Sequence, residues 1–362
     1  MTDGRNKSCL PPLPAESGDG MRRRILETLD RQEYGVLPRR EKSVGFCEVS
    51  RESSRFMAGK AEKRVMRITS VFDGGEHSFE VSAVIPRAHR PVPFFICPNF
   101  HSPVPNLYYP AEEIADLGFG VLHFYYKDVT CDRAFDSGDD QGVARLFFKT
   151  EAEARRCGKL SVWAWAASRV LDLAGTLEGL DMRYAGVIGH SRLGKTALLA
   201  AARDERFFAA FSNDSGCSGA ALHRYKNDKA ENVAAITKTF PYWFTGDFGK
   251  YAGREDSLPF DQHWLIAALC PRFVCVGSAA GDLWAAPDSE LASCRAASPA
   301  WESRGLRGFE EPRETGDRMK SFGGRVGYYR RPGPHWFSRS DWRDAAEFFR
   351  LKIEEKEARY GL

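Results

Sequence analysis

The chain has 362 residues, of which 43% are hydrophobic and 28% charged, so it can bury a large core in one elaborated domain or two smaller ones. Its 52 basic and 49 acidic residues leave a net charge of +3, which argues against the strong field of a protein that binds nucleic acid or a membrane surface. We therefore expect small molecules or neutral polymers as partners, and neither nucleic acid nor membrane.

The nine cysteines are scattered, odd in number and free of C-x-x-C pairs, so they predict neither a zinc site nor a disulfide framework. Several, such as Cys97, Cys270 and Cys275, lie in apolar runs, as free thiols in a reducing compartment do. No stretch approaches transmembrane length, and no apolar h-region follows the first basic residues. We expect a cytoplasmic protein without bound metal, unless a leader has been removed.

The first twenty residues mix Gly, Pro, Ser and charge without periodicity, so we expect a flexible arm over residues 1–20 and one domain over residues 21–362. Helical spacing predicts a helix over 22–32. Alternating apolar residues then predict antiparallel strands over 43–51, 65–71 and 79–85.

From Phe94 onward the apolar runs become nearly continuous, which is typical of parallel strands covered on both faces. The predicted strands are 94–97, 120–124, 185–188, 208–211 and 273–276, and the predicted helices are 111–117, 160–177, 195–202, 261–269 and 341–355. The fold class is therefore α/β, with a doubly wound, mostly parallel central sheet after antiparallel N-terminal strands.

The most informative segment runs from Tyr184 to Thr196, where an apolar run ends in a serine flanked by Gly189 and Gly194. A serine on a sharp strand-to-helix turn projects its hydroxyl beyond the sheet edge. There the next backbone N–H and the helix N-terminus can stabilise an oxyanion. Ser191 is therefore the predicted nucleophile, although the motif G-x-S-x-G would need glycine where Leu193 stands.

The same residues, Gly189 to Thr196, also satisfy G-x-x-x-x-G-K-[ST], the phosphate-binding loop of nucleotide-binding proteins. That alternative needs a following acid to hold Mg²⁺, and the segment 207–214 supplies only a broken version because Ser212 and Asn213 intervene. A P-loop also commonly opens its domain, whereas this motif follows several strands. A tight turn without chemistry is a third alternative.

An acyl-transfer serine needs a base and an acid, which in α/β-hydrolases follow in the order Ser, Asp or Glu, His. Asp214 and Asp282 each follow an apolar strand, so either can lie at the carboxyl edge of the sheet. His335 lies in a Pro/Gly loop between a strand and the last helix, where a hydrolase histidine belongs, whereas His263 sits in the first turn of a helix and suits a structural role.

With these residues assembled, the chain resembles the glucuronoyl esterase family of carbohydrate esterases, and more closely its bacterial, acetylxylan esterase-like branch. The family's elbow, G-[CH]-S-R-x-G-K, matches residues 189–195 and places Leu193 at its variable position. Further matches are D-S-G-C-S-G-A at 214–220, Y-W-F at 242–244 and L-P-F-D-Q-H at 258–263. The resemblance covers nearly all of residues 21–362 and implies a three-layer α/β/α hydrolase with an open, shallow site and no cofactor.

The resemblance also implies roles for individual residues. Ser191 would attack an ester carbonyl, His335 would move the proton, and Arg192 would stabilise the oxyanion with its backbone and side chain. An arginine there opposes the helix macrodipole, which supports a functional reason for it. Lys195 would contact sugar hydroxyls. The remaining substrate-binding candidates are Trp243, in the W-F element, and Trp284, for which a buried packing role is the alternative.

Two departures from the family pattern bear on the acid and the substrate. Family members often place glutamate where Asp214 stands, while some bacterial members use an acid in the loop of Asp282, so we favour Asp282 with Asp214 as support. The glutamate that fungal members carry shortly before the W-F element, as a uronate contact, has no counterpart, since Phe240 or Pro241 falls there.

The hypothesis is thus a serine carboxylester hydrolase on carbohydrate esters, cleaving 4-O-methyl-glucuronoyl esters through a Ser-His-Asp triad and an acyl-enzyme. The alternative is a sugar or acetylxylan O-deacetylase using the same triad. A P-loop nucleotide-binding protein is a more remote alternative.

Overall fold

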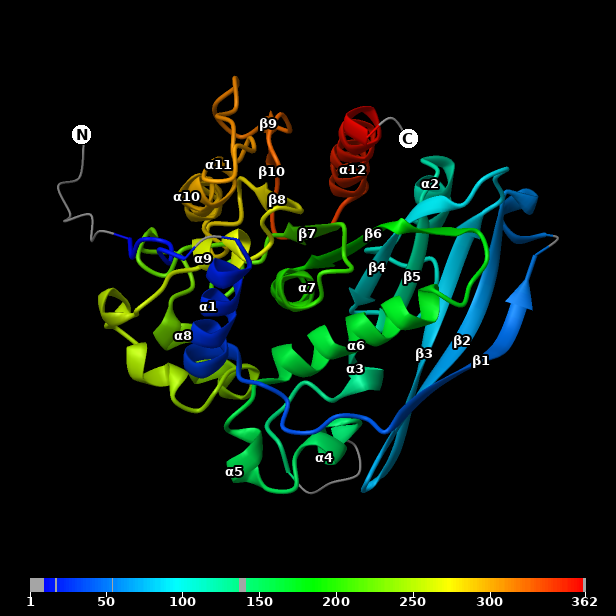
Figure 1. Ribbon diagram of the computed structural model, residues 1–362, viewed down its shortest axis with the longest axis horizontal. Helices are drawn as coiled ribbons and strands as arrows, with labels where there is room; N and C mark the ends of the chain where they lie inside the picture. Colours follow the sequence, from blue (N-terminus) through cyan, green and yellow to red (C-terminus); the bar gives the residue numbers. More distant parts are fainter. Residues whose placement is uncertain (1–9, 17, 54, 137–140, 361–362) are drawn as a thin grey trace.

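The computed structural model describes residues 10–16, 18–53, 55–136 and 141–360 (Figure 1). Its centre is a twisted ten-stranded sheet with the order β1-β2-β3-β5-β4-β6-β7-β8-β10-β9. The α/β fold class predicted from the sequence is confirmed.

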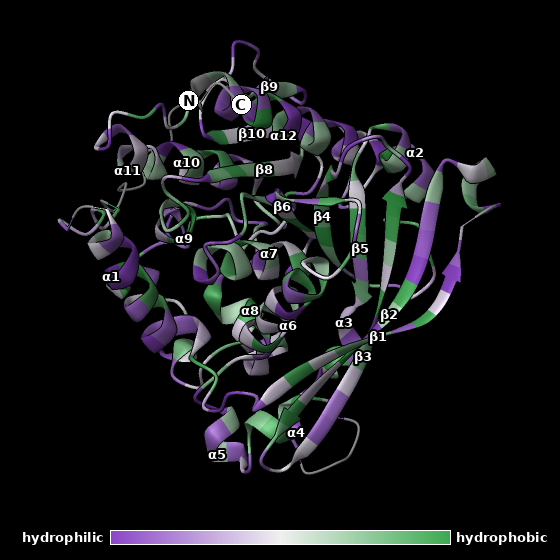
Figure 2. Cartoon of the chain, turned by 45° about the vertical axis from the view of Figure 1, so that its right-hand side comes forward, coloured by the Kyte–Doolittle hydropathy of each residue, from purple (hydrophilic) through white to green (hydrophobic). Residues whose placement is uncertain are grey.

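The sheet begins with an antiparallel portion. β1 (Ser43–Glu52), β2 (Ala61–Phe72) and β3 (Gly75–Pro86) pair in chain order, and β3 continues antiparallel onto β5 (Gly120–Tyr125). These strands alternate because one face meets the core and the other meets solvent. Figure 2 accordingly shows hydrophilic and hydrophobic segments interleaved along them.

The rest of the sheet is parallel and buried, as the continuous apolar runs predict. Its strands are β4 (Val92–Asn99), β5, β6 (Leu180–His190), β7 (Ala209–Asn213), β8 (Phe273–Ala279) and β10 (Val326–Arg331), with β9 (Met319–Ser321) antiparallel at the far edge. Parallel strands end at the same edge of a sheet, so the loops after β6, β7, β8 and β10 meet there.

Two pairs of helices cover the two faces of the sheet (Figure 1). α6 (Lys159–Ala174) and α7 (Arg192–Arg203) pack over β4, β6 and β7 and bury the larger hydrophobic cluster. α2 (Ala111–Asp116) and α12 (Arg339–Tyr360) cover the opposite face and bury a second, aromatic cluster. The molecule therefore has the three layers of an α/β/α sandwich.

The remaining elements are mostly short and connect these layers. They are α1 (Asp19–Leu29), α3 (Tyr126–Val129), α4 (Ala144–Phe147), α5 (Glu151–Ala154), α8 (Val233–Thr239), α9 (His263–Ala267), α10 (Pro287–Ala297), α11 (Pro299–Glu302), the π-helical η1 (Asp30–Tyr34) and the 3-10 turns η2 (Phe56–Gly59), η4 (Pro241–Trp243), η5 (Phe248–Tyr251) and η6 (Glu255–Ser257). The sequence did not reveal α10, because its buried face includes polar residues such as Ser289, Glu290 and Ser293 instead of an apolar stripe.

The predicted boundary at residue 20 falls inside helix α1, which begins at Asp19. Residues 1–9 and 17 of the expected arm lie outside the described residues. Within the described part, Leu13 packs against the core and the Pro11 carbonyl accepts a hydrogen bond from His263 Nε2 at 3.1 Å. His263 thus has a structural contact.

None of the helices in the described ranges is long and apolar enough to cross a membrane.

Phe95 of β4 is the centre of the aromatic cluster under α12. Its ring lies 5.1–5.5 Å from the rings of Phe119, Phe211, Trp342 and Phe349. Because Trp342 and Phe349 belong to α12, these edge-to-face contacts fasten the last helix, and the loop before it, onto the sheet.

A buried carboxyl ties α10 to the ends of two central strands. Glu290 accepts hydrogen bonds from the Gly216 N–H at 2.9 Å, just after β7, and from the Ser278 hydroxyl of β8 at 2.6 Å. Burial raises the pKa of Glu290 from its ordinary 4.5 to about 7, against the opposing effect of those hydrogen bonds. The loops at this edge therefore rest on a group that titrates near neutrality.

Replacing Phe95→Ala should lower the free energy of unfolding by about 3–5 kcal/mol, because it removes a fully buried ring and its four aromatic contacts. Denaturant titration measures this. The control Leu107→Ala, at a side chain that is 66% exposed, should change the stability by less than about 0.5 kcal/mol. Equal losses for the two variants would contradict the assignment of this core.

Glu290 should make the folded state less stable as pH rises. Its raised pKa means that the folded protein binds the proton more tightly than the unfolded chain, so its contribution is fully present below pH 4.5 and is lost as pH rises through about 7. Glu290→Gln should remove a pH-dependent change of roughly 3 kcal/mol in the free energy of unfolding across that window. Denaturant titration at several pH values measures this change. Parallel stability profiles of wild type and variant would contradict this account.

Candidate active site

Ser191 stands on a strained turn between β6 and α7. Its backbone has φ 56° and ψ −128°, in the positive-φ region that side chains other than glycine rarely adopt. Gly189 makes the turn possible, because a Cβ there would lie 2.0 Å from the Leu193 carbonyl oxygen. The Ser191 N–H donates to the Asn213 carbonyl at 2.9 Å, which fastens the turn to β7. This is the geometry of a nucleophile elbow.

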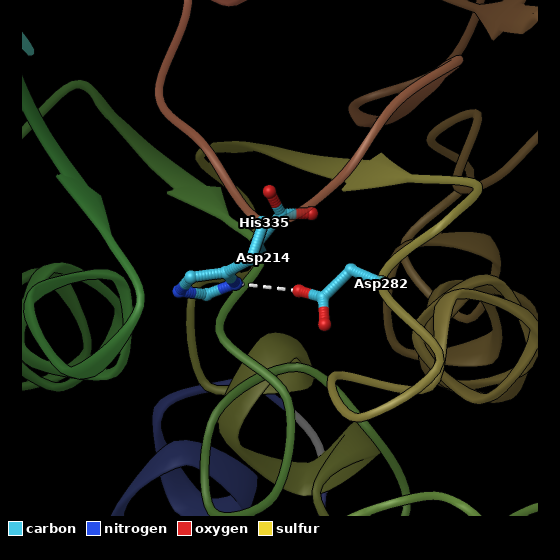
Figure 3. A group of neighbouring side chains, drawn as sticks. All are labelled: Asp214, Asp282 and His335. Carbon is cyan, nitrogen blue, oxygen red and sulfur yellow. Dashed lines mark hydrogen bonds and ion pairs between the residues drawn. The ribbon is translucent and has the colours of Figure 1, made fainter.

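His335 and Asp282 meet at the same edge of the sheet from two loops, one after β10 and one after β8 (Figure 3). The distance from His335 Nδ1 to Asp282 Oδ2 is 2.5 Å. The acid is buried, whereas 44% of the His335 side chain is exposed. A carboxylate on Nδ1 leaves Nε2 as the atom that can exchange a proton with a serine or an alcohol.

The Asp214 carboxylate lies beside this pair, but its hydrogen bonds go to other groups. Its Oδ1 accepts from the Ala279 N–H at 2.6 Å, and its Oδ2 lies 3.4 Å from an Arg331 nitrogen. Burial raises the pKa of Asp214 well above its usual range. His335 is thus hydrogen-bonded to Asp282, while Asp214 contacts the backbone of the last residue of β8 and the guanidinium of the last residue of β10.

These three side chains also form a group that could hold a cation, since one ligand atom from each lies within 4.8 Å of the others. The His335–Asp282 hydrogen bond and the Asp214 contacts already engage these three side chains. We therefore interpret the group as an acid–base site.

The loop that carries His335 is held by Arg331. Its Nη1 donates to the Pro332 and Pro334 carbonyls at 3.1 and 3.2 Å, and its Nε donates to the Asp341 carboxylate at 2.8 Å. Arg331 Nη2 also donates to the Trp336 carbonyl. Sequence reasoning missed Arg331 and Asp341, because neither belongs to a motif and the contacts form only when the loop folds back.

The Arg192 side chain is fixed by a salt bridge and by aromatic rings. Its guanidinium pairs with the Asp132 carboxylate and lies 4.7 Å from the Trp243 ring centre and 5.1 Å from that of Phe240. Asp132 accepts a further hydrogen bond from Trp243 Nε1 at 2.8 Å. Trp243 is almost fully buried, so it forms the wall behind Arg192. Nothing in the sequence around Asp132 indicated this role.

Lys195 is buried, and its ammonium donates to the Ser215 and Cys217 carbonyls, the latter at 2.6 Å. Burial lowers the pKa of this lysine. The Thr196 hydroxyl donates to the Arg192 carbonyl at 3.0 Å. In a P-loop these two side chains would face phosphate and Mg²⁺, so the P-loop hypothesis is wrong for this turn.

A carboxylate from further upstream lines the site, although the sequence has no glutamate just before the W-F element. Glu231 lies upstream of the position where Phe240 and Pro241 stand, and its Oε2 is 4.0 Å from Lys195 Nζ. Its N–H donates to the Trp284 carbonyl at 2.9 Å. The Trp284 side chain is 55% exposed, so the alternative of a buried packing tryptophan is wrong.

All of the candidate residues from the sequence line one pocket of about 350 Å³. Its lining is Ser191, Arg192, Lys195, Asp214, Ser215, Gly216, Glu231, Phe240, Trp243, Asp282, Trp284, Ala285 and His335. Two cations, three acids, a histidine and an exposed indole thus surround the serine.

Comparisons with known proteins relate this arrangement to one family. A family model described as "Glucuronyl esterase, fungi" matches residues 68–305, which include the elbow and both candidate acids. Carbohydrate esterase MZ0003 from an unknown prokaryotic organism is 38% identical over 242 residues, 66% of this chain and 54% of that protein. The chain thus spans about half the length of that relative. A 4-O-methyl-glucuronoyl methylesterase of Schizophyllum commune is 27% identical, covering 83% of this chain and 73% of its own.

Solved structures extend the likeness to nearly the whole chain. A glucuronoyl esterase from Solibacter usitatus is 30% identical with a TM-score of 0.83, covering 94% of this chain and 97% of that one. A structure described as a promiscuous CE15 esterase from the marine bacterial metagenome is 28% identical with a TM-score of 0.84, covering 95% and 97%. With the family model matched over most of its length, this chain belongs to the glucuronyl esterase family.

Proposed function

We propose that this protein is a serine carboxylester hydrolase that cleaves 4-O-methyl-glucuronoyl esters. The observation that carries the proposal is the meeting of a strained elbow serine, a histidine–aspartate pair and a fixed arginine in one pocket. A solved structure with the same fold is named glucuronoyl esterase and a sequence relative is named 4-O-methyl-glucuronoyl methylesterase, which supports this substrate class.

The proposed reaction uses these groups in turn. His335 takes the proton of the Ser191 hydroxyl at Nε2 while Asp282 holds the proton on Nδ1, and Ser191 Oγ attacks the ester carbonyl. The oxyanion that forms is stabilised by the Arg192 N–H and guanidinium. His335 then protonates the departing alcohol, and a water activated by the same base releases the uronate from Ser191.

Arg192 suits this task because its position is set before substrate arrives. The Asp132 carboxylate and the Trp243 ring hold the guanidinium, so little reorganisation is needed when negative charge develops. A planar, always charged guanidinium also tolerates such a partly buried position better than an ammonium.

The sugar would bind on the side of the pocket formed by Lys195, Glu231 and Trp284. Two of the three Lys195 N–H groups are used by carbonyls, which leaves one for a sugar hydroxyl, and Glu231 can accept from another. The exposed face of Trp284 can cover the apolar face of a pyranose ring. Neutral hydroxyls next to an oxyanion site match a uronate ester, whose acyl carbon carries the sugar.

We assign the triad acid to Asp282 and a supporting role to Asp214. Direct contact with His335 Nδ1 supports the first assignment, and the contacts of Asp214 with Ala279 and Arg331 support the second.

The proposed steps use side chains of the chain itself and call for no cofactor. We retain the cytoplasm as the proposed location. The eight cysteines in the described residues, all of them free thiols, support it.

Ser191→Ala should lower kcat for benzyl glucuronate by at least about 10⁴-fold, because it removes the nucleophile while leaving the fold intact. Hydrolysis of benzyl glucuronate and of 4-nitrophenyl acetate is measured in parallel, with the exposed Ser257→Ala as control. Serine-dependent activity on acetate alone would move the assignment to a sugar O-deacetylase. No serine-dependent hydrolysis of either ester would overturn the proposal.

Asp282→Asn should lower kcat/KM by about 10³- to 10⁴-fold, because an amide no longer holds the reactive tautomer of His335. Asp214→Asn should cost only about tenfold, since an amide oxygen can still accept from the Ala279 N–H. Both are assayed on benzyl glucuronate beside Asp256→Asn, whose side chain is 76% exposed. The reverse order would make Asp214 the acid.

A further inference from the structure

A second histidine lies directly beside the proposed base. His190 is the last residue of β6, precedes the nucleophile and is only 3% exposed. Its ring centre is 4.4 Å from that of His335, at an angle of 38° between the ring planes. The proposed reaction assigns no proton transfer to His190, so a buried imidazole at this place must have another role.

Hydrogen bonding keeps His190 in one neutral form. Its Nδ1 lies 2.7 Å from Asn213 Oδ1. The Asn213 amide nitrogen must face Asp341, where it donates at 3.1 Å to a carboxylate that also accepts from Arg331. Asn213 Oδ1 is therefore an acceptor, and His190 donates from Nδ1. Burial, followed by the nearby His335, lowers the pKa of His190 to about 3.

The other ring nitrogen contributes no hydrogen bond. His190 Nε2 is buried and has no partner among the residues that the structure describes. What surrounds this imidazole is aromatic: Phe337 lies parallel to it at 5.8 Å and Tyr108 lies at 5.3 Å. Tyr108 in turn contacts the Trp336 ring at 4.9 Å. Residues 335, 336 and 337 thus all pack, directly or through Tyr108, against the residue before the nucleophile.

We propose that His190 is a positioning residue, whose neutral ring forms the wall against which the His335 imidazole packs. This inference rests on the proposed function of Ser191 and His335. The Asp282 hydrogen bond fixes one atom of a half-exposed ring, and a ring held at one atom can still swing about that contact. The His190 face removes this freedom. Because His190 and Ser191 are adjacent, base and nucleophile are held on one rigid unit.

Two substitutions separate the ring from its hydrogen bond. His190→Phe keeps a flat ring and loses the donor to Asn213, whereas His190→Gln keeps a donor and loses the ring. His190→Leu is a second ringless variant in case the Gln variant folds poorly. We expect His190→Phe to stay within about fivefold of wild type, and the ringless variants to lose about 50- to 100-fold in kcat with KM changed less than threefold.

The rate at which a fluorophosphonate modifies Ser191 is measured beside hydrolysis of benzyl glucuronate, each normalised to the folded fraction from circular dichroism. Fluorophosphonate reacts with an activated serine whatever the natural ester is. His263→Phe and His263→Gln, at a buried histidine bonded to Pro11, are the matched controls and should leave both rates unchanged.

A fall in both rates for the ringless variants but not for His190→Phe supports the inference. Equal rates for the Phe and Gln variants, or a lower rate for Phe, would overturn it and leave only a structural hydrogen bond. Wild-type Ser191 that reacts with fluorophosphonate but hydrolyses no uronate ester would overturn the proposed function alone. An unreactive wild-type serine would overturn both.

Discussion

The interaction on which the site depends is the fan of hydrogen bonds from Arg331. This guanidinium joins the end of β10 to Asp341 at the start of α12 and to the carbonyls of the loop between them. A buried cation needs such complete pairing, because an unsatisfied one would be costly in a low-dielectric interior. The same contacts hold the loop in the course that brings His335 into hydrogen-bond contact with Asp282, which lies in the loop after β8.

Around Arg331, some charged side chains hold others in place, and those others line the pocket. Asp132 holds Arg192, and backbone carbonyls hold Lys195, so the two cations of the pocket are placed before any substrate enters. Glu290 beneath the loops and Asp214 beside the His335–Asp282 pair are buried acids whose pKa values are raised by burial. Preorganised polar groups of this kind favour a transition state more than a ground state. The aromatic rings around His190 apply the same principle of preorganisation to packing instead of charge.

The linear sequence was enough to predict the main strands and helices of the fold and the site residues that belong to motifs. Continuous apolar runs predicted the parallel strands, and the order of Ser191, Asp282 and His335 was readable because each follows a strand or a loop with a local signature. Helix α10 was not predicted because its buried face includes polar residues, and Ser289 and Glu290 meet their hydrogen-bond partners, the Leu222 carbonyl and the Ser278 hydroxyl, only in the folded state. Asp132 and Glu231 were not predicted because the side chains that they meet, Arg192 and Lys195, belong to a distant segment. Arg331 was not predicted because its contacts form only when the loop after β10 folds back on it.

By itself, then, the sequence determined the α/β architecture, the glycines that permit the turn at Ser191 and the set of candidate side chains, because these depend on local conformation and periodicity. Only the tertiary structure decided which acid contacts His335, whether Trp284 is exposed, and that Lys195 faces carbonyls instead of phosphate. Those outcomes depend on how loops after separate strands converge at one edge of the sheet. Which loops converge depends on distances in the folded chain, and the residues next to each loop in the sequence do not indicate those distances.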